Sequence, residues 1–541
     1  MLFDVTLRLV PRLRDSLRVT EGLFFMNKRR YVTTAIDYPN AAPHMGHVLE
    51  KVLADVIARW FRSTGRETRL QIGTDEHGVK IQQTADKQGV APQELVDRNV
   101  ALFQDLYAKL DVSADHFVRT TDQKDHWPTV QALWRKLRDA GALEKRSYTG
   151  LYCSGCERFV TAKDLVEGLC PDHNVAPQEV VEENWFFKLK DKTEYLQKIL
   201  TDGTYRIVPE YRAAETMELL KNGLEDVSFS RPITTLKWGI PVPDDDGQVM
   251  YVWCDALTNY ISTLGLLTDD RHAEFWNDAT VTHVIGKDIA RFHALIWPAM
   301  LDYAGIRVPD ELLIHGFVTN EGQKMSKSLG NVVQPTEVLD HFSGQADPIR
   351  FFLCHEIPVG RDGDFSWKRL DEIYQSKLGN QLGNMLNRAL VLLKKDEGVV
   401  KIAKRDGDAE QAAKIWSDVS AKMDTYEIHA ALQEITAQVS CMNQAFNDAA
   451  PWKIKEDAVL RIETLGTFAE SLRQIALLLL PFVPDTAYRM SKQLGVPYAE
   501  EMKNKDFVVT DALKAWGGAT GWEKVGEPEI LFKQLEPKVD A

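Results

Sequence analysis

Two lysines in a short polar segment have the types and spacing to bind a polyphosphate. Lys324 and Lys327 lie within residues 321–331, among serines and glycines and after the apolar run 312–318. Glycines let a backbone bend, and ammonium groups supply positive charge without demanding one geometry, so the segment could close on phosphate groups. Taken alone, such a pair is more typical of a solvated surface loop.

A second phosphate-type site is expected where an early strand meets a helix. The β-branched run 31–36 leads through a turn-like stretch into residues 44–64, whose apolar side chains recur at helical spacing. His44 and His47 fall at the start of that helix, where backbone N–H groups favour phosphate oxygens. Gly46 leaves room for a base to lie against the backbone. By themselves, the two histidines are better explained as capping or core residues.

The elements around this helix predict a parallel sheet. Residues 31–72 have the pattern of a strand, a helix and a second strand, the last at 68–72. Ligands of such sheets bind at the carboxyl ends of the strands, so His44 and the loop 73–78 are expected on one rim. Asp75 in that loop could hold a substrate ammonium group, although a turn-stabilising aspartate explains it equally well.

An aromatic pattern in the middle of the chain could form the wall of an apolar pocket. If a helix begins near Trp253, then Trp253, Ala256 and Tyr260 lie on one of its faces. Two aromatic rings that frame a small residue could enclose an unbranched apolar side chain, and a thioether would gain sulfur–aromatic contacts. Helix core packing is the simpler explanation of the spacing alone. A further strand and helix follow at residues 281–297.

Three cysteines and a histidine have the spacing of a metal site. Cys153 and Cys156 form a Cys-x-x-Cys pair, and Cys170 and His173 form a Cys-x-x-His pair shortly after it. This spacing is typical of tetrahedral zinc. Four protein ligands leave no open position, so we expect zinc to stabilise an insertion and to take no part in chemistry. The alternative is three buried cysteines with a histidine nearby by chance.

The last third of the chain has side chains suited to an unpaired nucleic acid. The pattern becomes almost wholly helical over residues 367–494, and Asn384 and Arg388 lie one turn apart on one of the helices. Asn and Arg can bind base edges, and Trp452 could stack on a base. A solvated helical bundle with one buried tryptophan is the alternative.

Composition limits these hypotheses. The 541 residues contain 44% hydrophobic and 27% charged residues, as expected for several globular domains. The formal charge of −14 argues against non-specific coating of nucleic acids. The chain has no apolar run long enough to span a membrane, and its six cysteines are too few for a disulfide scaffold, so we expect a cytoplasmic protein. Residues 1–26 fit neither a signal nor a transit peptide, and Met26 lies just before the first expected strand, so we expect an N-terminal extension or a misassigned start.

The order of two motifs resembles the signatures of class I aminoacyl-tRNA synthetases. His-Met-Gly-His occupies residues 44–47, and Lys-Met-Ser-Lys-Ser occupies residues 324–328. Within that class the chain is most similar to the methionyl-tRNA synthetase family, on Ala-Ile-Asp-Tyr at 35–38, Gly-Thr-Asp-Glu-His-Gly at 73–78 and Tyr-Val-Trp-Cys-Asp-Ala at 251–256. The metal-type spacing, Gly-Lys-Asp-Ile at 286–289 and Pro-Trp at 451–452 add to the likeness.

The resemblance implies an α/β fold, with a Rossmann-type parallel-sheet catalytic domain that carries a zinc-knuckle insertion and precedes an all-α helical bundle. The expected ranges are an extension at 1–29, the two halves of the catalytic domain at 30–147 and 231–320, the insertion at 148–230, the lysine loop and connecting region at 321–365, and the anticodon-binding bundle at 366–541. The bundle leaves no room for a further dimerisation module, so a monomer is expected.

The resemblance also implies which residues bind each substrate. The methionine pocket would be formed by Ile36, Tyr38, Asp75, Arg231, Trp253, Ala256, Tyr260, Ile289 and His293, with Asp75 on the amino group and Arg231 facing the carboxylate. ATP would meet His44, Gly46, His47, Gly286, Asp288, Lys324 and Lys327, and the anticodon CAU would meet Asn384, Arg388 and Trp452. One departure is Asp37, which stands where a small or apolar residue is more usual.

The implied reaction activates L-methionine with Mg²⁺-ATP and transfers the methionyl group to the terminal ribose of tRNA(Met). Zinc would be structural. Relatives specific for leucine, isoleucine or valine carry an editing insertion for which residues 148–231 have no room, and a cysteine-specific enzyme would need an open zinc site. An inactive RNA-binding relative would lack the lysines or histidines, and a small nucleotidyltransferase would not need the helical tail.

Overall fold

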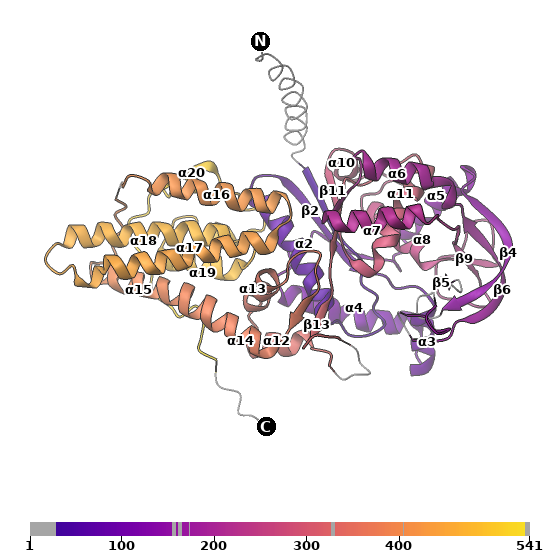
Figure 1. Ribbon diagram of the computed structural model, residues 1–541, viewed down its shortest axis with the longest axis horizontal. Coiled ribbons are helices and arrows are strands. Elements are labelled where there is room, and N and C mark those ends of the chain that lie inside the picture. The colour runs from indigo at the N-terminus through magenta and orange to yellow at the C-terminus, as the bar shows by residue number, and fades with distance from the viewer. Residues whose placement is uncertain are drawn as a thin grey trace, which may run out of the picture.

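The computed structural model describes residues 29–153, 158–160, 165–171, 174–325, 331–403 and 405–535 of the chain. Figure 1 shows two parts along the longest axis, a parallel sheet with its surrounding helices and strands, and a bundle of helices. The expected class, an α/β part followed by an all-α bundle, is confirmed. Residues 1–28, most of the expected extension, lie outside the described residues. Within the described part, no helix is long and apolar enough to cross a membrane.

The main sheet has six parallel strands in the order β3-β2-β1-β11-β12-β7. The chain adds β2 and β3 on one side of β1, and β11 and β12 on the other, so the strand order reverses between β1 and β11. Such a switch point opens a crevice at the carboxyl ends of the strands. The strands are β1 (Arg29–Thr34), β2 (Glu67–Thr74), β3 (His116–Arg119), β7 (Arg206–Val208), β11 (Thr280–Gly286) and β12 (Glu311–His315).

Helix α2 (Met45–Ser63) joins the two parts of the molecule. It contacts β1, β2 and β11 on the sheet side and α13 (Asp347–Glu356) on the other, and almost all of its side chains are buried. The Asp55 carboxylate on α2 lies 2.8 Å from a guanidinium nitrogen of Arg350 on α13. Arg350 also donates to the carbonyl of Phe482, 2.9 Å away. This helix therefore fixes the sheet against the bundle.

The helix expected at residues 44–64 forms as α2, one residue shorter at each end, and α4 (Pro92–Lys109) and α5 (His126–Asp139) follow it. The remaining elements around the sheet are α3 (Val79–Gln88), α6 (Thr193–Thr201), α7 (Glu210–Lys221), β9 (Ser230–Pro232), β10 (Gln248–Met250), α8 (Val252–Leu257), α9 (Asn259–Ser262), α10 (Glu274–Asn277), the 3₁₀ turn η3 (Lys287–Ile289), the π-helical turn η4 (Phe292–Ile296) and α11 (Trp297–Tyr303).

An antiparallel sheet forms the insertion. Its order is β5-β4-β6-β8, and the long pair of β4 and β6 runs from Leu143 opposite Phe187 to Tyr152 opposite Gln178. The strands are β4 (Leu143–Cys153), β5 (Arg158–Val160), β6 (Gln178–Phe187) and β8 (Val227–Ser228). Strand β7 falls inside the range 148–230, yet it pairs with β12, so this part of the range belongs to the main sheet.

The bundle shares one apolar core with one face of the main sheet. This core includes Val52 of α2, Leu432 of α17 and Leu472 of α18, so the two parts are packed as one body. The connecting segment contains β13 (Val318–Asn320), β14 (Gln323–Lys324), α12 (Pro335–His341), α13 and β15 (Gly363–Phe365). The bundle contains α14 (Trp367–Ile373), the π-helix η6 (Tyr374–Gly383), α15 (Asn384–Lys394), α16 (Asp408–Asp424), α17 (Ile428–Ala449), the turn η7 (Pro451–Lys453), α18 (Ala458–Leu479), α19 (Pro484–Leu494) and α20 (Asp511–Lys514).

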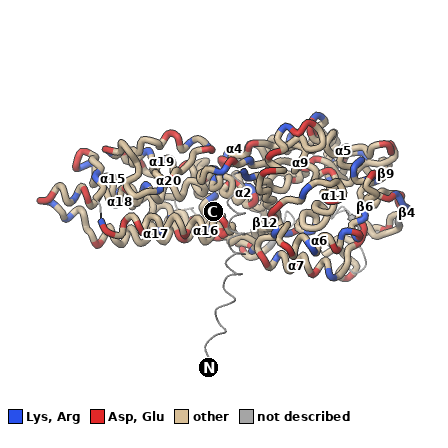
Figure 2. The backbone as a smooth tube through the Cα atoms, turned by 90° about the horizontal axis from the view of Figure 1, so that it is seen from above, with Lys and Arg blue, Asp and Glu red and all other residues tan. Residues whose placement is uncertain are grey.

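Acidic and basic residues are intermixed over both parts of the molecule (Figure 2). The formal charge of −14 is therefore spread along the chain, and an RNA partner would have to meet a local arrangement of side chains.

Candidate functional site

A cavity lies at the switch point of the main sheet. It brings together seven of the nine residues expected for the methionine pocket, which come from the β1 exit, the β2 exit, α8, α9, η3 and η4. The expected residues in its lining are Ile36, Asp75, Trp253, Ala256, Tyr260, Ile289 and His293, and the others are Ala35, Leu257 and Asn259.

Two aromatic stacks form the walls of this cavity. Trp253 stacks on Phe292, with ring centroids 3.7 Å apart and planes 7° from parallel. Tyr260 stacks on His283 with centroids 4.1 Å apart. The chain reaches this arrangement with two short helices, α8 and α9, where one continuous helix face was expected. Trp253, Ala256 and Tyr260 nevertheless line the same cavity, as their spacing predicts.

A hydrogen bond between Tyr260 and His293 gives the cavity a polar, uncharged wall. The Tyr260 hydroxyl lies 2.6 Å from His293 Nε2, and His293 Nδ1 lies 3.0 Å from the carbonyl of Ile289. The Nδ1–H therefore donates to that carbonyl, and Nε2 accepts the hydroxyl proton. Burial lowers the pKa of His293 to about 4, although the backbone bond and the charge of Glu50 oppose the shift. At neutral pH the ring carries no charge.

A second buried histidine supports this wall from behind. The Trp297 indole N–H donates to His283 Nε2 over 3.2 Å, so Nδ1 carries the proton and meets the Thr33 hydroxyl at 2.6 Å. Burial, with a smaller contribution from His293, lowers the pKa of His283 well below its usual range. Both histidines behind Tyr260 are thus neutral and have fixed tautomers.

The loop that carries Asp75 is held by backbone hydrogen bonds to the β1 exit. Asp37 N donates to the carbonyl of Gly73 and Asp75 N donates to the carbonyl of Asp37, both over 2.8 Å. A Cβ at position 73 would lie 2.3 Å from the Val118 carbonyl oxygen, so only glycine fits there. The Asp75 side chain lines the cavity, so a carboxylate stands where an ammonium group could enter.

A buried carboxylate bridges two histidines beside the cavity, and the sequence did not predict it. Asp255 accepts from His77 Nδ1 and from His126 Nε2, each at 2.6 Å. Burial alone would raise the pKa of Asp255, but the charge of His77 and the bonds from both histidines outweigh it, and the pKa lies below its usual range. His77 and Asp255 belong to motifs noted above, but their wide separation along the chain gave no signal that they pair.

The paired histidines at the start of α2 have their rings stacked, with centroids 3.8 Å apart. His47 Nδ1 accepts the backbone N–H of His44 at 3.0 Å, and His44 Nδ1 accepts that of Gly46 at 3.2 Å. In each neutral ring the proton therefore lies on Nε2. Burial, and then the neighbouring His44 and Lys51, lower the pKa of His47 well below its usual range.

The rest of the expected ATP site lies partly outside the described residues. Gly286 ends β11, and a Cβ there would lie 2.7 Å from Asp288 Oδ1, so the backbone and this exposed carboxylate are close. Lys324 pairs with Thr319 of β13 through its backbone, but its side chain is not described. Lys327 lies outside the described residues.

Two residues expected in the methionine pocket fall outside the lining set. Tyr38 packs against the small apolar cluster that includes Ile81 and Val96. Arg231 is buried, donates to the Ser228 hydroxyl over 2.7 Å and lies 5.0 Å from the centroid of Tyr251. Their expected roles stay predictions.

The residues expected to read an anticodon meet at the surface of the bundle. The Arg388 guanidinium lies 5.4 Å from the ring centroid of Trp452 and 4.8 Å from that of Phe446, and it donates to Asn447 over 2.9 Å. Trp452 is 41% exposed. Asn384 is also exposed, one turn before Arg388 on α15.

The metal-type cysteines are described only in part. Cys153 and Cys170 are buried and join one small apolar cluster with Val160. Cys156 and His173, the other two expected ligands, lie outside the described residues. Within the residues that the structure describes, no group of three or more His, Cys, Asp or Glu could hold a metal ion.

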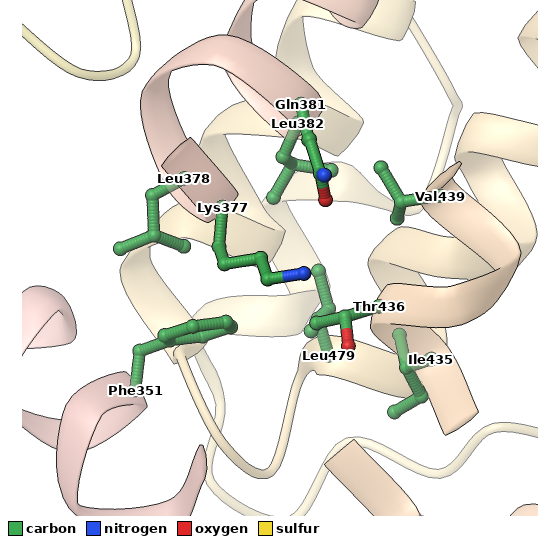
Figure 3. A pocket seen from close by; sticks show the side chains of 9 residues that line it. All are labelled: Phe351, Lys377, Leu378, Gln381, Leu382, Ile435, Thr436, Val439 and Leu479. Atoms are coloured by element: carbon green, nitrogen blue, oxygen red, sulfur yellow. The ribbon is translucent and has the colours of Figure 1, made fainter. Parts of the chain in front are cut away.

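A second cavity lies inside the bundle, and it contains none of the expected site residues (Figure 3). Lys377 of η6 points among apolar side chains from α13, α17 and α18. The lining residues are Phe351, Lys377, Leu378, Gln381, Leu382, Ile435, Thr436, Val439 and Leu479.

Comparisons of the sequence with known proteins identify the family of this chain. The sequence profile of the family described as tRNA synthetases class I (M) matches residues 30–181 and 173–390. The methionine–tRNA ligase of Caldanaerobacter subterraneus is 39% identical over 523 residues, which cover 94% of this chain and 80% of that protein. The enzyme of the same name from Rhizobium meliloti is 42% identical over 480 residues, which cover 86% of this chain and 92% of that protein.

Solved structures give the same result. The methionyl-tRNA synthetase of Mycobacterium tuberculosis in complex with methionyl-adenylate superposes with a TM-score of 0.84 at 34% identity, covering 93% of this chain and 99% of that one. Its apo form superposes with a TM-score of 0.79 at 31% identity. This chain belongs to the methionyl-tRNA synthetase family of class I aminoacyl-tRNA synthetases.

Proposed function

We propose that the chain is a methionine–tRNA ligase. It activates L-methionine with ATP to methionyl adenylate and pyrophosphate, and it then transfers the methionyl group to the 3′ terminal ribose of tRNA(Met). The observation that carries this proposal is the cavity at the switch point, where two aromatic side chains and a carboxylate come together. Helix α2 lies beside it, because Lys51 of α2 donates to the carbonyl of Ala35 in the cavity lining.

Methionine fits the chemistry of the cavity. Its unbranched thioether would lie between Trp253 and Tyr260, where sulfur gains contact with aromatic rings. The Tyr260 hydroxyl proton is used by His293 Nε2, so this neutral pair adds polarity to the wall without placing a charge beside the thioether. The Asp75 carboxylate at the mouth would pair with the ammonium group, and Arg231 would face the carboxylate. A single methylene in such a slot is worth only about 1–3 kcal/mol, so rejection of close isosteres would be modest.

The start of α2 is suited to hold the phosphates of Mg²⁺-ATP. Because both Nδ1 atoms accept backbone N–H groups, His44 and His47 present Nε2–H as the donor of each neutral ring. These donors add to the backbone N–H groups of a helix N-terminus, which favour anions. Lys324 and Lys327 would approach from the lysine loop. Gly46, Gly286 and Asp288 would receive the nucleoside.

The chemistry consists of two displacements. The methionine carboxylate attacks the α-phosphorus of ATP, the bond to the bridging oxygen breaks, and pyrophosphate leaves. The charge that develops on pyrophosphate is neutralised by Lys324, Lys327 and the two histidines. A terminal ribose hydroxyl of tRNA then attacks the methionyl carbonyl, and AMP leaves. These residues position the substrates and neutralise the developing charge, so no covalent enzyme intermediate is needed.

The exposed face around Trp452 would read the anticodon CAU. Trp452 offers a surface for an unpaired base, and Arg388 is held against it by a cation–π contact and a hydrogen bond. Asn384 can bind a base edge from the same helix. This arrangement supplies local recognition in a chain that is acidic as a whole.

The insertion would be stabilised by zinc. Cys153 and Cys170 lie in one buried cluster, and thiolates at this spacing are preferred zinc ligands. Cys156 and His173 would complete a closed tetrahedral site, which takes no part in the reaction. We also propose that the enzyme acts as a monomer with the domain ranges given above, with β7 assigned to the catalytic sheet.

The test is methionine-dependent exchange of labelled pyrophosphate into ATP, followed by charging of tRNA(Met) and, as a control, of a tRNA with another anticodon. We expect exchange with methionine and none with leucine or cysteine, and charging of tRNA(Met) alone. Failure of exchange with methionine, or faster exchange with another amino acid, would overturn the proposal.

A further inference from the structure

Four buried ionisable side chains, to which no role has been given above, form a continuous chain beside the cavity. They are His315, Glu50, Lys51 and Asp37, called here the buried charge chain. Each is at most 6% exposed. They come from the ends of β12 and β1 and from α2, so they join the segments that meet at the switch point.

The contacts along this chain are short and specific. His315 Nε2 lies 3.2 Å from Glu50 Oε2, and Glu50 Oε1 accepts from Lys51 Nζ over 2.8 Å. Lys51 also donates to Asp37 Oδ1 over 2.8 Å and to the carbonyl of Ala35 over 3.0 Å. An ammonium group has three N–H donors, and all three are used.

The two ends of the buried charge chain reach the two halves of the proposed site. A Cβ at Gly286 would lie 3.7 Å from the His315 ring, so His315 lies beside a residue that is proposed to bind ATP. At the other end, Ala35 lines the cavity, and the Asp37 carbonyl accepts from the backbone N–H of Asp75. Lys51 is therefore hydrogen-bonded to Ala35 in the cavity wall and to Asp37, whose backbone pairs with the loop that carries Asp75.

Stability alone does not explain this arrangement. Taking charges out of water costs free energy, and well-packed apolar residues of similar volume are often as stable as a buried ion pair. Asp37 also departs from the small or apolar residue that the family resemblance predicts. Burial raises the pKa of Asp37 to about 6, against the charge of Lys51, so its ionised form at neutral pH depends on that lysine. Tyr107 donates to its second oxygen over 2.6 Å.

We propose that Lys51 and Asp37 are positioning residues for methionine, and that they set the Asp75 carboxylate at the place where it meets the substrate ammonium group. This inference deepens the proposed function and rests on it. Because the wall at Ala35 and the backbone at Asp37 are both fixed through Lys51, loss of that ammonium would let the Asp75 loop shift. Recognition of the amine would then weaken more than recognition of the thioether.

The test compares two inhibitors of the exchange reaction that cannot react, because both lack the carboxylate. Methioninol keeps the ammonium group, and 4-(methylthio)butan-1-ol replaces it with hydrogen. The inhibition constant of 4-(methylthio)butan-1-ol divided by that of methioninol measures how well the amine is recognised. In Lys51→Met this ratio should fall about tenfold or more, as a small misplacement costs up to about a hundredfold. The rate at saturating methionine should change much less.

Further variants separate positioning from general damage. Asp75→Asn should abolish the preference for methioninol, and adding Lys51→Met to it should cause no further fall in the ratio. Glu470→Gln is the matched control, because it disrupts a buried ion pair with Arg473 in the bundle and should leave the ratio unchanged. If Lys51→Met does not fold, Asp37→Asn/Lys51→Met removes one charge of each sign and should show the same fall.

The outcomes distinguish the two claims. No methionine-dependent exchange in the parent chain overturns the proposed function, and this inference with it. Exchange in the parent together with an unchanged inhibitor ratio in the Lys51 variants overturns the inference alone. Equal weakening of both inhibitors also overturns it, because that result describes a structural lysine without a role in placing Asp75.

Discussion

The two cavities of this molecule differ in what surrounds them. The cavity at the switch point gathers six segments from distant parts of the chain, and its polar atoms have defined partners such as Tyr260 with His293. The cavity in the bundle is enclosed by four helices and is mainly apolar, apart from Lys377, Gln381 and Thr436. The first has the properties of a binding site. The second is a gap in packing beside the π-helix η6.

The largest expected effect comes from a residue of the lysine loop, which is not among the described residues that line either cavity. Lys327→Ala should lower the rate of adenylate formation by a transition-state loss of about 3–4 kcal/mol, because it removes charge that meets the leaving pyrophosphate. Methionine affinity should change little. Lys377→Ala, which removes a lysine from the bundle cavity, is the control. Pyrophosphate exchange at the parent rate in Lys327→Ala would contradict the assignment.

Matched aromatic truncations should sharpen the contrast between the cavities. Phe351→Ala should destabilise the fold by about 3 kcal/mol, because it enlarges a gap in the core, and leave the KM for methionine unchanged. Trp253→Ala should weaken methionine binding by about 1–2 kcal/mol and change the stability of the fold little. Denaturant titration and exchange kinetics measure both quantities. A raised methionine KM in Phe351→Ala would break the distinction.

The neutral wall of the first cavity predicts a pH dependence. His293 has a folded pKa of about 4, below its ordinary value, so lowering the pH protonates the unfolded chain first and stability is lost. Between pH 7 and pH 5 this residue should cost about 2 kcal/mol of stability. His293→Gln should lose less stability over that interval in thermal melts. The raised pKa of Asp37 makes its contribution to stability grow as the pH falls. Asp37 is present in both proteins, so its contribution cancels when their pH profiles are compared. Identical pH profiles would show that His293 is not held neutral.

The smallest expected effect concerns the surface of the bundle. Trp452→Ala should weaken charging of tRNA(Met) by about 1–2 kcal/mol, since one stacked base is lost. Methionine-dependent pyrophosphate exchange should be unchanged, because the exposed ring lies on the bundle and outside both cavities. The exposed Val459→Ala on α18 is a control. A fall in exchange would place Trp452 in the activation step.

Local pattern predicted most of the fold. The strand, helix and strand around α2 have strong periodicity, and the spacing of Trp253, Ala256 and Tyr260 placed all three in one cavity. Short-range pattern could not show that α8 and α9 are separate or that η4 and η6 are π-helical, because both depend on tertiary packing. It also could not show that β7 joins the main sheet, since strand order depends on the whole topology.

The missed parts of the site are contacts between distant residues. Asp255 meets His77 and His126, and Glu50 meets His315, across long stretches of the chain. Nothing in the local sequence of a buried aspartate or lysine names its partner. The family resemblance predicted residues that would touch substrate, but it did not point to the buried charge chain behind them.

The most direct test is a structure of the full chain with methionine bound, determined by diffraction from crystals soaked in it. Density should fill the cavity at the switch point, with the sulfur between Trp253 and Tyr260 and the amino group beside Asp75. An empty cavity there, with methionine bound elsewhere on the molecule, would contradict the account.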